Sequence, residues 1–331
     1  MSDIDRLIQV AERLLQRIDA ALPSVPPPTD WSAIAFRWRV RQGDGRGWLE
    51  AVRHPHAIRL EDLQGIDDQK RRLEQNTRQF VTGRSANNVL LTGARGTGKS
   101  SLVKAALNRF AAKGLRLIEV DKDDLVHLPE IVDLVAGRKE RFVIFCDDLS
   151  FEAGEPGYKA MKSILDGSVS GMPDNLLVYA TSNRRHLMPE KMAENLETVH
   201  TADGEIHPGE TTEEKVSLSE RFGLWLSFYP FDQDHYLVIC EHWLQVFGLD
   251  QKSALAARQD ALLWSLSRGA RSGRVAWQFA RDYAGKAKGK PSQRGKEAPS
   301  PRPPSRGRGS ASASQGDIDG PSPRPPSRGR G

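Results

Sequence analysis

The sequence of 331 residues contains only two cysteines, Cys146 and Cys240, and neither belongs to a CxxC pair or a His/Cys cluster. These cysteines do not suggest a disulfide scaffold, and such usage is typical of a reducing compartment. No apolar run approaches the roughly 18 residues that a membrane-spanning helix needs. The first residues, MSDID, are unlike a secretory signal or an arginine-rich transit peptide. We therefore expect a cytoplasmic protein with no membrane partner.

A basic surface over the whole protein is also absent, although the formal net charge is +5. From Gly285 onward the chain has 11 Lys and Arg against 3 Asp and Glu, whereas the preceding residues have 37 against 40. The positive charge therefore belongs to the tail, residues 285–331, and does not indicate a globally basic nucleic-acid surface. The tail is rich in Gly, Pro, Ser and Arg and contains PSPRPPSRGRG twice, at Pro299–Gly309 and Pro321–Gly331. This composition predicts a disordered segment that makes weak, salt-sensitive contacts with polyanions.

Residues 1–59 precede the main body of the chain and divide into two parts. Apolar residues recur every three or four positions over residues 1–22, which predicts an amphipathic helix ended by the prolines that follow. We expect this helix to pack on the body or on a neighbouring subunit. Residues 31–59 interleave aromatic and arginine side chains, for which two interpretations stay open. The aromatic rings either stack on nucleic-acid bases or belong to a short strand, Ala33–Val40, with its aromatics on one face.

Short apolar runs alternate with helical patterns from residue 60 to residue 231. Such alternation is typical of an α/β fold, in which a parallel sheet is covered by helices on both faces. From residue 232 to residue 284 the pattern is purely helical and predicts a small helical lid domain. The expected strands are Asn88–Thr92, Leu115–Val120, Phe142–Cys146 and Leu176–Thr181, and the expected helices are Lys99–Ala112, Leu128–Ala136, Tyr158–Leu165, Asp234–Val246, Lys252–Leu266 and Gly273–Tyr283.

A glycine-rich loop lies between the strand that ends at Thr92 and the helix that follows it. Glycines let the backbone N–H groups converge on phosphate oxygens, and the helix N-terminus adds partial positive charge. In this GxxxxGK[ST] pattern the lysine meets the β- and γ-phosphates, while the serine hydroxyl ligates Mg²⁺. The sequence therefore predicts a P-loop that binds ATP with Mg²⁺. Its residues are Gly93, Ala94, Arg95, Gly96, Thr97, Gly98, Lys99, Ser100 and Ser101.

Polar side chains end two of the apolar runs that come after this loop. Asp147 and Asp148 follow Phe142–Cys146, at the carboxyl end of a strand, where a parallel α/β sheet faces its ligand. Asp147 suits the metal ion, and Asp148 suits orientation of the attacking water, with Glu152 as the alternative base. Asn183 follows a later strand and is expected to hydrogen-bond the γ-phosphate or the attacking water.

The order of these motifs resembles the AAA+ ATPase superfamily over roughly residues 60–284. GARGTGKS, FVIFCDD, YATSN and SERF are similar to its Walker A, Walker B, sensor 1 and arginine-finger boxes. LQGID, at residues 63–67, resembles the segment that contacts the adenine, and GARSGR, at residues 269–274, resembles the sensor 2 box. More narrowly, the chain is similar to an uncharacterised bacterial family of stand-alone AAA+ proteins, a domain of unknown function. Such a resemblance implies a fold but identifies no substrate.

The resemblance also implies roles for residues outside the P-loop. Gly65 and Ile66 are expected to contact the adenine. Arg221 is expected to reach the γ-phosphate of the next subunit, and Arg274, in preference to Arg271, that of its own subunit. A catalytic arginine supplied by a neighbour implies a homo-oligomer, as a ring or an open assembly.

Two functions follow from this resemblance, and both involve an unidentified macromolecular partner. The first is ATP hydrolysis that drives remodelling. The alternative is a slowly hydrolysing, nucleotide-gated switch or loader on nucleic acid or protein, because Walker B ends in Asp-Asp, whereas many AAA+ proteins have Asp-Glu. The segment Glu194–Glu214 holds seven acidic residues and no Lys or Arg, and it is either a partner-binding loop or a solvated one.

Overall fold

The computed structural model describes residues 27–41, 43–151, 155–166, 172–183 and 218–287, a few helical positions before residue 14, and two short strands near residue 200. These two strands, β7 (Val199–His200) and β8 (Ile206–His207), pair antiparallel. Most of the expected N-terminal helix, most of the acidic segment 194–214 and nearly all of the tail lie outside the described residues. The expectations for these three segments therefore stay predictions.

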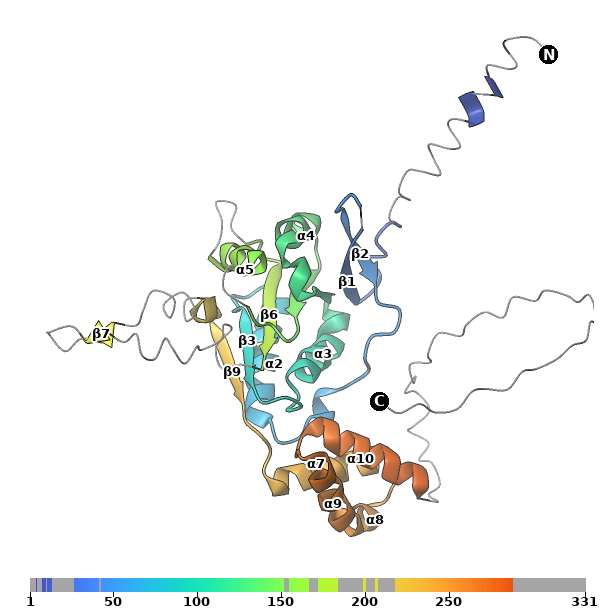
Figure 1. Ribbon diagram of the computed structural model, residues 1–331, viewed down its shortest axis with the longest axis vertical. Coiled ribbons are helices and arrows are strands. Elements are labelled where there is room, and N and C mark those ends of the chain that lie inside the picture. The colour runs from blue at the N-terminus through green and yellow to red at the C-terminus, as the bar shows by residue number, and fades with distance from the viewer. Residues whose placement is uncertain are drawn as a thin grey trace, which may run out of the picture. The chain divides into compact units, whose positions relative to one another are not determined.

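Seven strands of the described chain form one sheet, in the order β2-β1-β4-β5-β6-β3-β9 (Figure 1). Neighbouring strands are parallel except β1 and β2, which form an antiparallel hairpin. The strands are β1 (Ala35–Val40), β2 (Gly47–Ala51), β3 (Val89–Gly93), β4 (Leu115–Glu119), β5 (Arg141–Cys146), β6 (Leu176–Ser182) and β9 (Leu224–Phe228). Strands β3 to β6 begin and end within one residue of the prediction. Strands β2 and β9 are absent from it.

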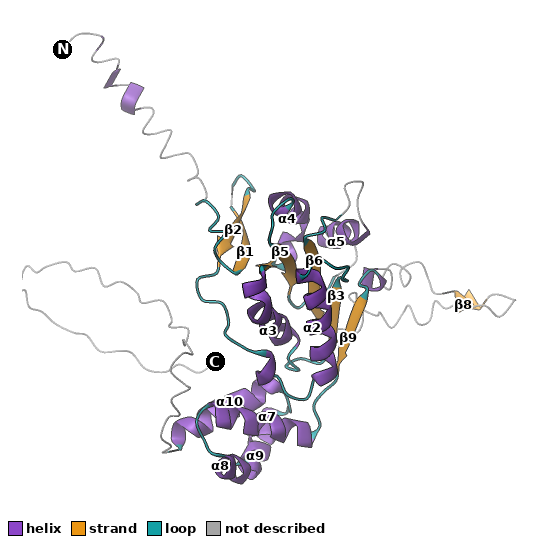
Figure 2. Ribbon diagram, turned by 180° about the vertical axis from the view of Figure 1, so that it is seen from behind, coloured by secondary structure: helices purple, strands orange, loops and turns teal. Residues whose placement is uncertain are grey.

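Helices cover both faces of the sheet (Figure 2). They are α2 (Asp67–Val81), α3 (Lys99–Phe110), α4 (Leu128–Val135) and α5 (Pro156–Asp166), with 3₁₀ turns η1 (Leu60–Asp62), η2 (Ala111–Lys113) and η3 (Lys122–His127). Alternate residues of β5 enter two separate cores. Val143 and Phe145 pack with α2 and α3, whereas Phe142 and Ile144 pack with α4 and α5. The predicted fold class, a mainly parallel sheet sandwiched by helices, is therefore confirmed.

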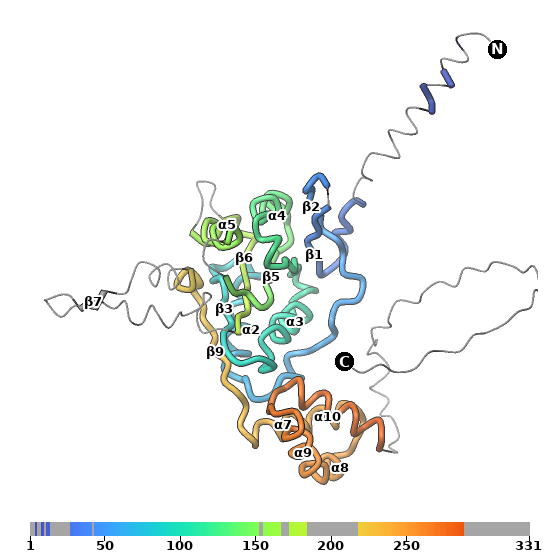
Figure 3. The backbone as a smooth tube through the Cα atoms, in the orientation of Figure 1, coloured from blue at the N-terminus to red at the C-terminus, as the bar shows by residue number. Residues whose placement is uncertain are grey.

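After β9 the chain leaves the sheet and forms four helices that share a core of their own (Figure 3). They are α7 (Gln233–Val246), α8 (Gln251–Ala256), α9 (Arg258–Arg268) and α10 (Gly273–Lys286). The prediction of a single helix over Lys252–Leu266 is wrong, because the chain bends at the fully buried Ala257, where α8 ends and α9 begins. The bend lets Ala254 and Ala261 enter the same core. No helix within the described ranges is both long and apolar enough to cross a membrane.

Two aromatic residues of the N-terminal hairpin lie inside the protein. Phe36 and Trp38 are fully buried in β1, and Gly47 leaves the space for the Trp38 ring, because a Cβ there would stand 1.8 Å from it. On the opposite face of the strand, Arg37 forms an ion pair with Glu119 at 2.7 Å. The interpretation of this segment as a strand is therefore correct. Bases cannot stack on Phe36 or Trp38, since neither ring is exposed.

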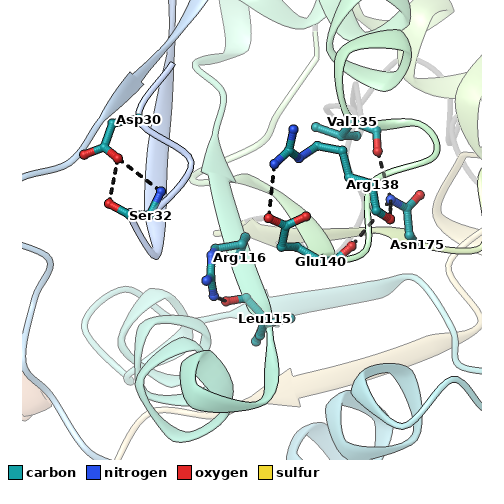
Figure 4. A network of polar contacts seen from close by, with 8 residues as sticks. All are labelled: Asp30, Ser32, Leu115, Arg116, Val135, Arg138, Glu140 and Asn175. Carbon is teal, nitrogen blue, oxygen red and sulfur yellow. Dashed lines mark hydrogen bonds and ion pairs between the residues drawn. The ribbon is translucent and has the colours of Figure 1, made fainter. Parts of the chain in front are cut away.

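A polar network joins the amino-terminal ends of β5 and β6 (Figure 4). The side-chain amide of Asn175 donates to the carbonyl oxygens of Val135 and Arg138, at 2.8 and 3.2 Å. The guanidinium of Arg138 donates to Glu140 at 3.1 Å and lies over Trp31, with Cζ 3.6 Å from the ring centroid. This network fixes the loop between α4 and β5 at the sheet edge opposite the carboxyl ends of the parallel strands.

Candidate functional site

The loop between β3 and α3 has a backbone that glycine adopts most easily. Gly93, Gly96 and Gly98 have φ angles of 124°, 74° and 99°, in the left-handed region where a side chain is strained. Gly93 also lies so close to β9 that a Cβ would stand 1.9 Å from the carbonyl oxygen of Phe228. The loop leads directly into α3, which begins at Lys99, so the unpaired amides of that helix lie beside it. This is the turn that a phosphate cradle requires.

The ammonium group of Lys99 donates hydrogen bonds to the backbone of the loop and to Asn183. Its Nζ donates to two carbonyl oxygens of the loop, at 2.7 and 2.8 Å, and to Oδ1 of Asn183 at 3.0 Å. Lys99 is only 6% exposed. Burial lowers the pKa of its amine, against the opposing effect of the nearby Asp148 and Asp147 carboxylates. Each hydrogen-bond acceptor of this ammonium in the described structure is neutral, which suits a site that receives an anionic ligand.

Ser100 and Asp147 meet at the carboxyl edge of the sheet. The Ser100 hydroxyl donates to Oδ1 of Asp147 at 2.5 Å, so the first turn of α3 reaches the end of β5. Hydroxyl and carboxylate oxygens are ligands that Mg²⁺ takes up together with water and phosphate oxygens. The structure therefore brings together the two residues expected to hold the metal ion.

Asp148 is the one non-glycine residue with a positive φ, 53°, among the residues that the structure describes. Asp tolerates this left-handed conformation better than most residues, and the chain turns sharply there after β5. The Asn183 amide donates to the Asp148 carboxylate through Nδ2 and accepts from Lys99 through Oδ1. Lys99, Asn183 and Asp148 thus form a continuous line of hydrogen bonds across the site.

Other predicted P-loop residues complete the turn. The Thr97 hydroxyl donates to the Ala94 carbonyl oxygen at 2.8 Å, Arg95 is exposed, and Ser101 is partly buried in the first turn of α3.

Glu152 lies outside the described residues, so the choice between Asp148 and Glu152 as the base stays open. One participant is missing from the sequence-based prediction: the hydroxyl of Thr181 donates to Asp147 at 2.6 Å. Thr181 belongs to the polar cluster that ends β6, but its spacing from Asn183 does not show that it contacts Asp147.

The sequence matches a known protein family over most of its length. The family described as "Protein of unknown function (DUF815)" matches residues 31–287. This chain belongs to that family. The match covers the β1–β2 hairpin, the sheet and the helices from α7 to α10, so the DUF815 unit includes both the hairpin and the helical segment. No curated protein matches the chain.

Several solved structures are similar to this DUF815 protein. The Thermotoga maritima RuvB Holliday junction branch migration motor is 15% identical with a TM-score of 0.38, over 69% of this chain and 72% of RuvB. A chain of the Escherichia coli MS115-1 HORMA:CdnC:Trip13 complex is 14% identical with a TM-score of 0.44, over 70% of this chain and 91% of that one. Aeropyrum pernix ORC1 in complex with DNA is 17% identical with a TM-score of 0.42, over 67% and 60% of the two chains. This chain has its P-loop at the carboxyl end of β3 in a mainly parallel sheet, and a helical segment follows the last strand.

The helical segment of the DUF815 protein touches the P-loop directly. The backbone N–H of Gly273 donates to the carbonyl oxygen of Gly96 at 2.8 Å. A Cβ on Gly96 would stand 2.8 Å from the Cβ of Ser272. The hydroxyl of Ser272 caps α10, because it accepts from the N–H of Val275 at 3.2 Å. The start of α10 therefore lies against the P-loop.

Arg271 and Arg274 flank this contact. Both are exposed, and neither forms an ion pair or a side-chain hydrogen bond with another described residue. Arg274 lies nearer the loop, since its Cβ is 3.8 Å from the place of a Cβ on Gly96. The preference for Arg274 as sensor 2 agrees with this short distance and stays a prediction.

Gly65 and Ile66 lie between the P-loop and the beginning of the helical segment. Gly65 has a φ of 75°, and a Cβ there would stand 3.2 Å from the rings of both Phe231 and His235. Ile66 is buried, and its Cδ1 lies 3.5 Å from the place of a Cβ on Gly98. The segment expected to contact the adenine thus adjoins the phosphate cradle.

A buried carboxylate close to this segment joins the sheet to the helical segment. Asp62 is 7% exposed and accepts from the backbone N–H of Arg59 at 2.9 Å, while Nε2 of His242 lies 3.5 Å from its Oδ1. Burial acts to raise the pKa of Asp62, but the contacts with His242 and Arg59 outweigh it and lower the pKa to about 2. Asp62 therefore stays ionised at the contact between η1 and α7.

We expect Asp62→Asn to reduce the free energy of unfolding by about 2 kcal/mol near neutral pH. A carboxyl whose pKa is about 2 in the folded protein, against about 3.9 when unfolded, stabilises the fold above the unfolded value. That stabilisation is lost as the pH falls through the folded value. Melting temperatures of the two proteins should therefore differ most above about pH 5 and converge toward about pH 2. A difference that stays constant with pH contradicts this role of Asp62.

Arg221 lies at the amino-terminal ends of the parallel strands, whereas the P-loop lies at their carboxyl ends. Its Nε forms an ion pair with Asp166, at the end of α5. Arg221 precedes β9, and the last residue of that strand, Phe228, pairs with Gly93. The length of β9 thus separates Arg221 from the phosphate cradle of its own chain.

Proposed function

We propose that this DUF815 protein binds ATP with Mg²⁺ at the P-loop and hydrolyses it to remodel an unidentified macromolecule. The proposal rests on one observation, the convergence of three separate segments at the carboxyl edge of the sheet. Lys99 contacts Asn183 at 3.0 Å, and the adjacent Ser100 contacts Asp147 at 2.5 Å. A lysine beside a phosphate cradle, a hydroxyl–carboxylate pair and a polar amide are the groups that phosphoryl transfer uses.

The residues at this site fit both the nucleotide and the metal ion. The Lys99 ammonium is buried with neutral acceptors only, so phosphate oxygens are stronger partners than the carbonyls it now contacts. Ser100 and Asp147 are the residues that hold Mg²⁺, which neutralises charge on the phosphates. Gly65 and Ile66 contact the adenine, and Arg274 contacts the γ-phosphate from the helical segment.

Asp148 and Asn183 act on the attacking water. The Asp148 carboxylate accepts a hydrogen bond from the water and, as general base, takes its proton during attack on the γ-phosphate. Asn183 donates to that carboxylate and so holds it in place beside Lys99. An aligned water and a fixed carboxylate lower the entropy that must be lost to reach the transition state.

We also propose that the active form is a homo-oligomer. Arg221 cannot reach the phosphates of its own chain, because β9 separates it from them. In a homo-oligomer, Arg221 contacts the phosphates that are bound by the P-loop of a second copy of the chain. The macromolecule that the assembly remodels is a separate partner.

A nucleotide-gated switch or loader with slow turnover is the second candidate. It is favoured by the short second acid, Asp148, which is bound to Asn183 and through it to Lys99. Phosphate release measured beside native mass with and without ATP separates the two functions. A remodelling ATPase turns over rapidly with its partner, whereas a switch turns over slowly and changes only its assembly or affinity with ATP.

Lys99→Ala is expected to abolish tight ATP binding, because the substitution removes the charge that meets the β- and γ-phosphates. Calorimetry of ATP binding measures the effect. Lys104→Ala, on the same helix but outside the loop, is the matched control and should bind ATP like the unaltered protein. An unchanged affinity in Lys99→Ala excludes this loop as the nucleotide site.

A further inference from the structure

Thr181 connects the two acidic residues that end β5. It is 1% exposed in the neighbouring strand β6. Its hydroxyl donates to Oδ1 of Asp147 at 2.6 Å and accepts from the backbone N–H of Asp148 at 2.9 Å. The carbonyl oxygen of Thr181 also accepts from the N–H of Leu149 at 2.6 Å. One buried residue therefore contacts three successive residues of the turn after β5.

The contact with Asp147 determines how that carboxylate is turned. Oδ1 accepts hydrogen bonds from both Thr181 and Ser100, at 2.6 and 2.5 Å. Within the described structure no side chain donates to the other oxygen, Oδ2. Two donors on one oxygen fix the rotation of the carboxylate, and Oδ2 is left for a cation.

The contact with Asp148 supports its left-handed backbone. Asp148 has a φ of 53°, a conformation that needs support from its surroundings. The N–H of Asp148 is satisfied by the Thr181 hydroxyl, and the next N–H, of Leu149, by the Thr181 carbonyl oxygen. This backbone conformation is the one in which the Asp148 carboxylate reaches Asn183.

We propose that Thr181 is a positioning residue for the metal site: its hydroxyl orients Asp147 toward Mg²⁺ and at the same time holds Asp148 beside Asn183. This inference rests on the proposed binding of ATP with Mg²⁺ at the P-loop. The hydroxyl acts through the two carboxylates and contacts neither the metal ion nor the nucleotide. A group that orients a metal ligand typically changes metal affinity by about 10–100-fold when it is removed.

Thr181→Val tests this inference, because valine keeps the shape of threonine and lacks the hydroxyl. ATP affinity is measured by calorimetry in EDTA and across a titration of Mg²⁺. We expect unchanged affinity in EDTA and a rise of about 10-fold or more in the Mg²⁺ concentration that gives half of the metal-dependent effect. Thr181→Ser retains the hydroxyl and is expected to restore the Mg²⁺ dependence of the unaltered protein.

A buried threonine outside the site provides the matched control. Thr77 is fully buried in α2, and its hydroxyl contacts Tyr179 at 2.9 Å. Thr77→Val also removes a buried hydroxyl and should lower the melting temperature without any change in Mg²⁺ dependence. If Thr181→Val is too unstable to purify, Thr181→Ala removes the same hydroxyl and carries the same expectation.

The outcomes separate this inference from the proposed function. If the unaltered protein binds ATP and responds to Mg²⁺, but the Thr181 variants without a hydroxyl respond identically, the positioning role is overturned and the proposed function stands. If Thr77→Val shifts the Mg²⁺ dependence as much as Thr181→Val does, the effect is general destabilisation and the role is again overturned. If the unaltered protein shows no ATP binding, the proposed function itself fails.

Discussion

Arg221→Ala is expected to bind ATP with unchanged affinity, to assemble with ATP, and to hydrolyse it about 10³–10⁵-fold more slowly. This range is the one found for arginine fingers that neighbouring proteins supply to GTPases. A guanidinium at the transferring phosphoryl group stabilises charge that develops in the transition state, so its loss affects turnover far more than binding. The measurement is phosphate release at saturating ATP, beside calorimetry of ATP binding.

Arg221 lies too far from the phosphate cradle of its own chain to contact a phosphate there. Gly93 pairs with Phe228, the last residue of β9, and Arg221 lies before the first residue of that strand. With a rise of about 3.3 Å per residue, the stretch from Arg221 to Phe228 spans on the order of 20 Å. A single side chain does not cover that distance. If Arg221 acts on a phosphate, that phosphate is therefore bound by another copy of the chain.

Mixing two inactive variants tests this arrangement. Arg221→Ala keeps an intact P-loop, and Lys99→Ala keeps an intact Arg221, so a mixed assembly contains interfaces with both residues intact. Titrating one variant against the other at fixed total protein should raise turnover above the sum of the two separate rates. Arg258→Ala, which removes an arginine from the ion pair with Glu241 in the helical segment, is the control for loss of an arginine elsewhere.

A structural arginine gives a different pattern. If Arg221 acts only through its ion pair with Asp166, Asp166→Ala lowers turnover as much as Arg221→Ala does. Mixtures shown to co-assemble then stay at the sum of the separate rates. That combination removes Arg221 from the catalytic groups and keeps Arg271 and Arg274 as candidates for contact with the γ-phosphate.

The local chemistry of the P-loop explains why the sequence predicts it. Three glycines in a span of six residues, between an apolar run and a helical pattern, permit a loop with positive φ angles, and the structure has those angles at Gly93, Gly96 and Gly98. Strands β3, β5 and β6 are predicted equally well, because burial on both faces requires nearly continuous apolar runs, and β4 is predicted although Arg116 interrupts its apolar residues. In these segments, residues that are adjacent in the sequence are enough to predict the local structure.

Strands β2 and β9 depend instead on distant partners. Gly47–Ala51 and Leu224–Phe228 each lie at an edge of the sheet and pair with one neighbouring strand. Their apolar residues are interrupted by Glu50 and Ser227, so neither segment reads as a buried run. The bend at Ala257 is hidden for a related reason, since the apolar spacing continues across it without a glycine or proline.

Contacts around the site also join residues that are far apart in the chain. Thr181 reaches Asp147 across 34 positions, and Arg221 reaches Asp166 across 55. Periodicity and motif spacing carry no information about such pairs, which exist only once the sheet has brought its strands together. The sequence therefore predicts which residues carry chemistry better than it predicts which residues position them.

Asp148→Asn is expected to retain ATP binding and to lower turnover by about 10²–10⁴-fold, the range that a positioned acid–base group typically contributes. Asparagine suits this position because, like aspartate, it tolerates the left-handed backbone that Asp148 adopts. The substitution thus removes the charge and keeps the turn after β5. Loss of a negative charge near the phosphates leaves ATP affinity equal or slightly higher.

The comparison with Glu152→Gln decides which carboxylate activates the water. Phosphate release and ATP affinity are measured for both variants under the same conditions, since both exchange a carboxylate for an amide of similar size. If Asp148 is the base, Asp148→Asn loses turnover and Glu152→Gln retains most of it. Normal turnover in Asp148→Asn, with the loss in Glu152→Gln, transfers the role to Glu152. Asp148 then remains the group that holds Asn183, and through it Lys99, at the phosphate cradle.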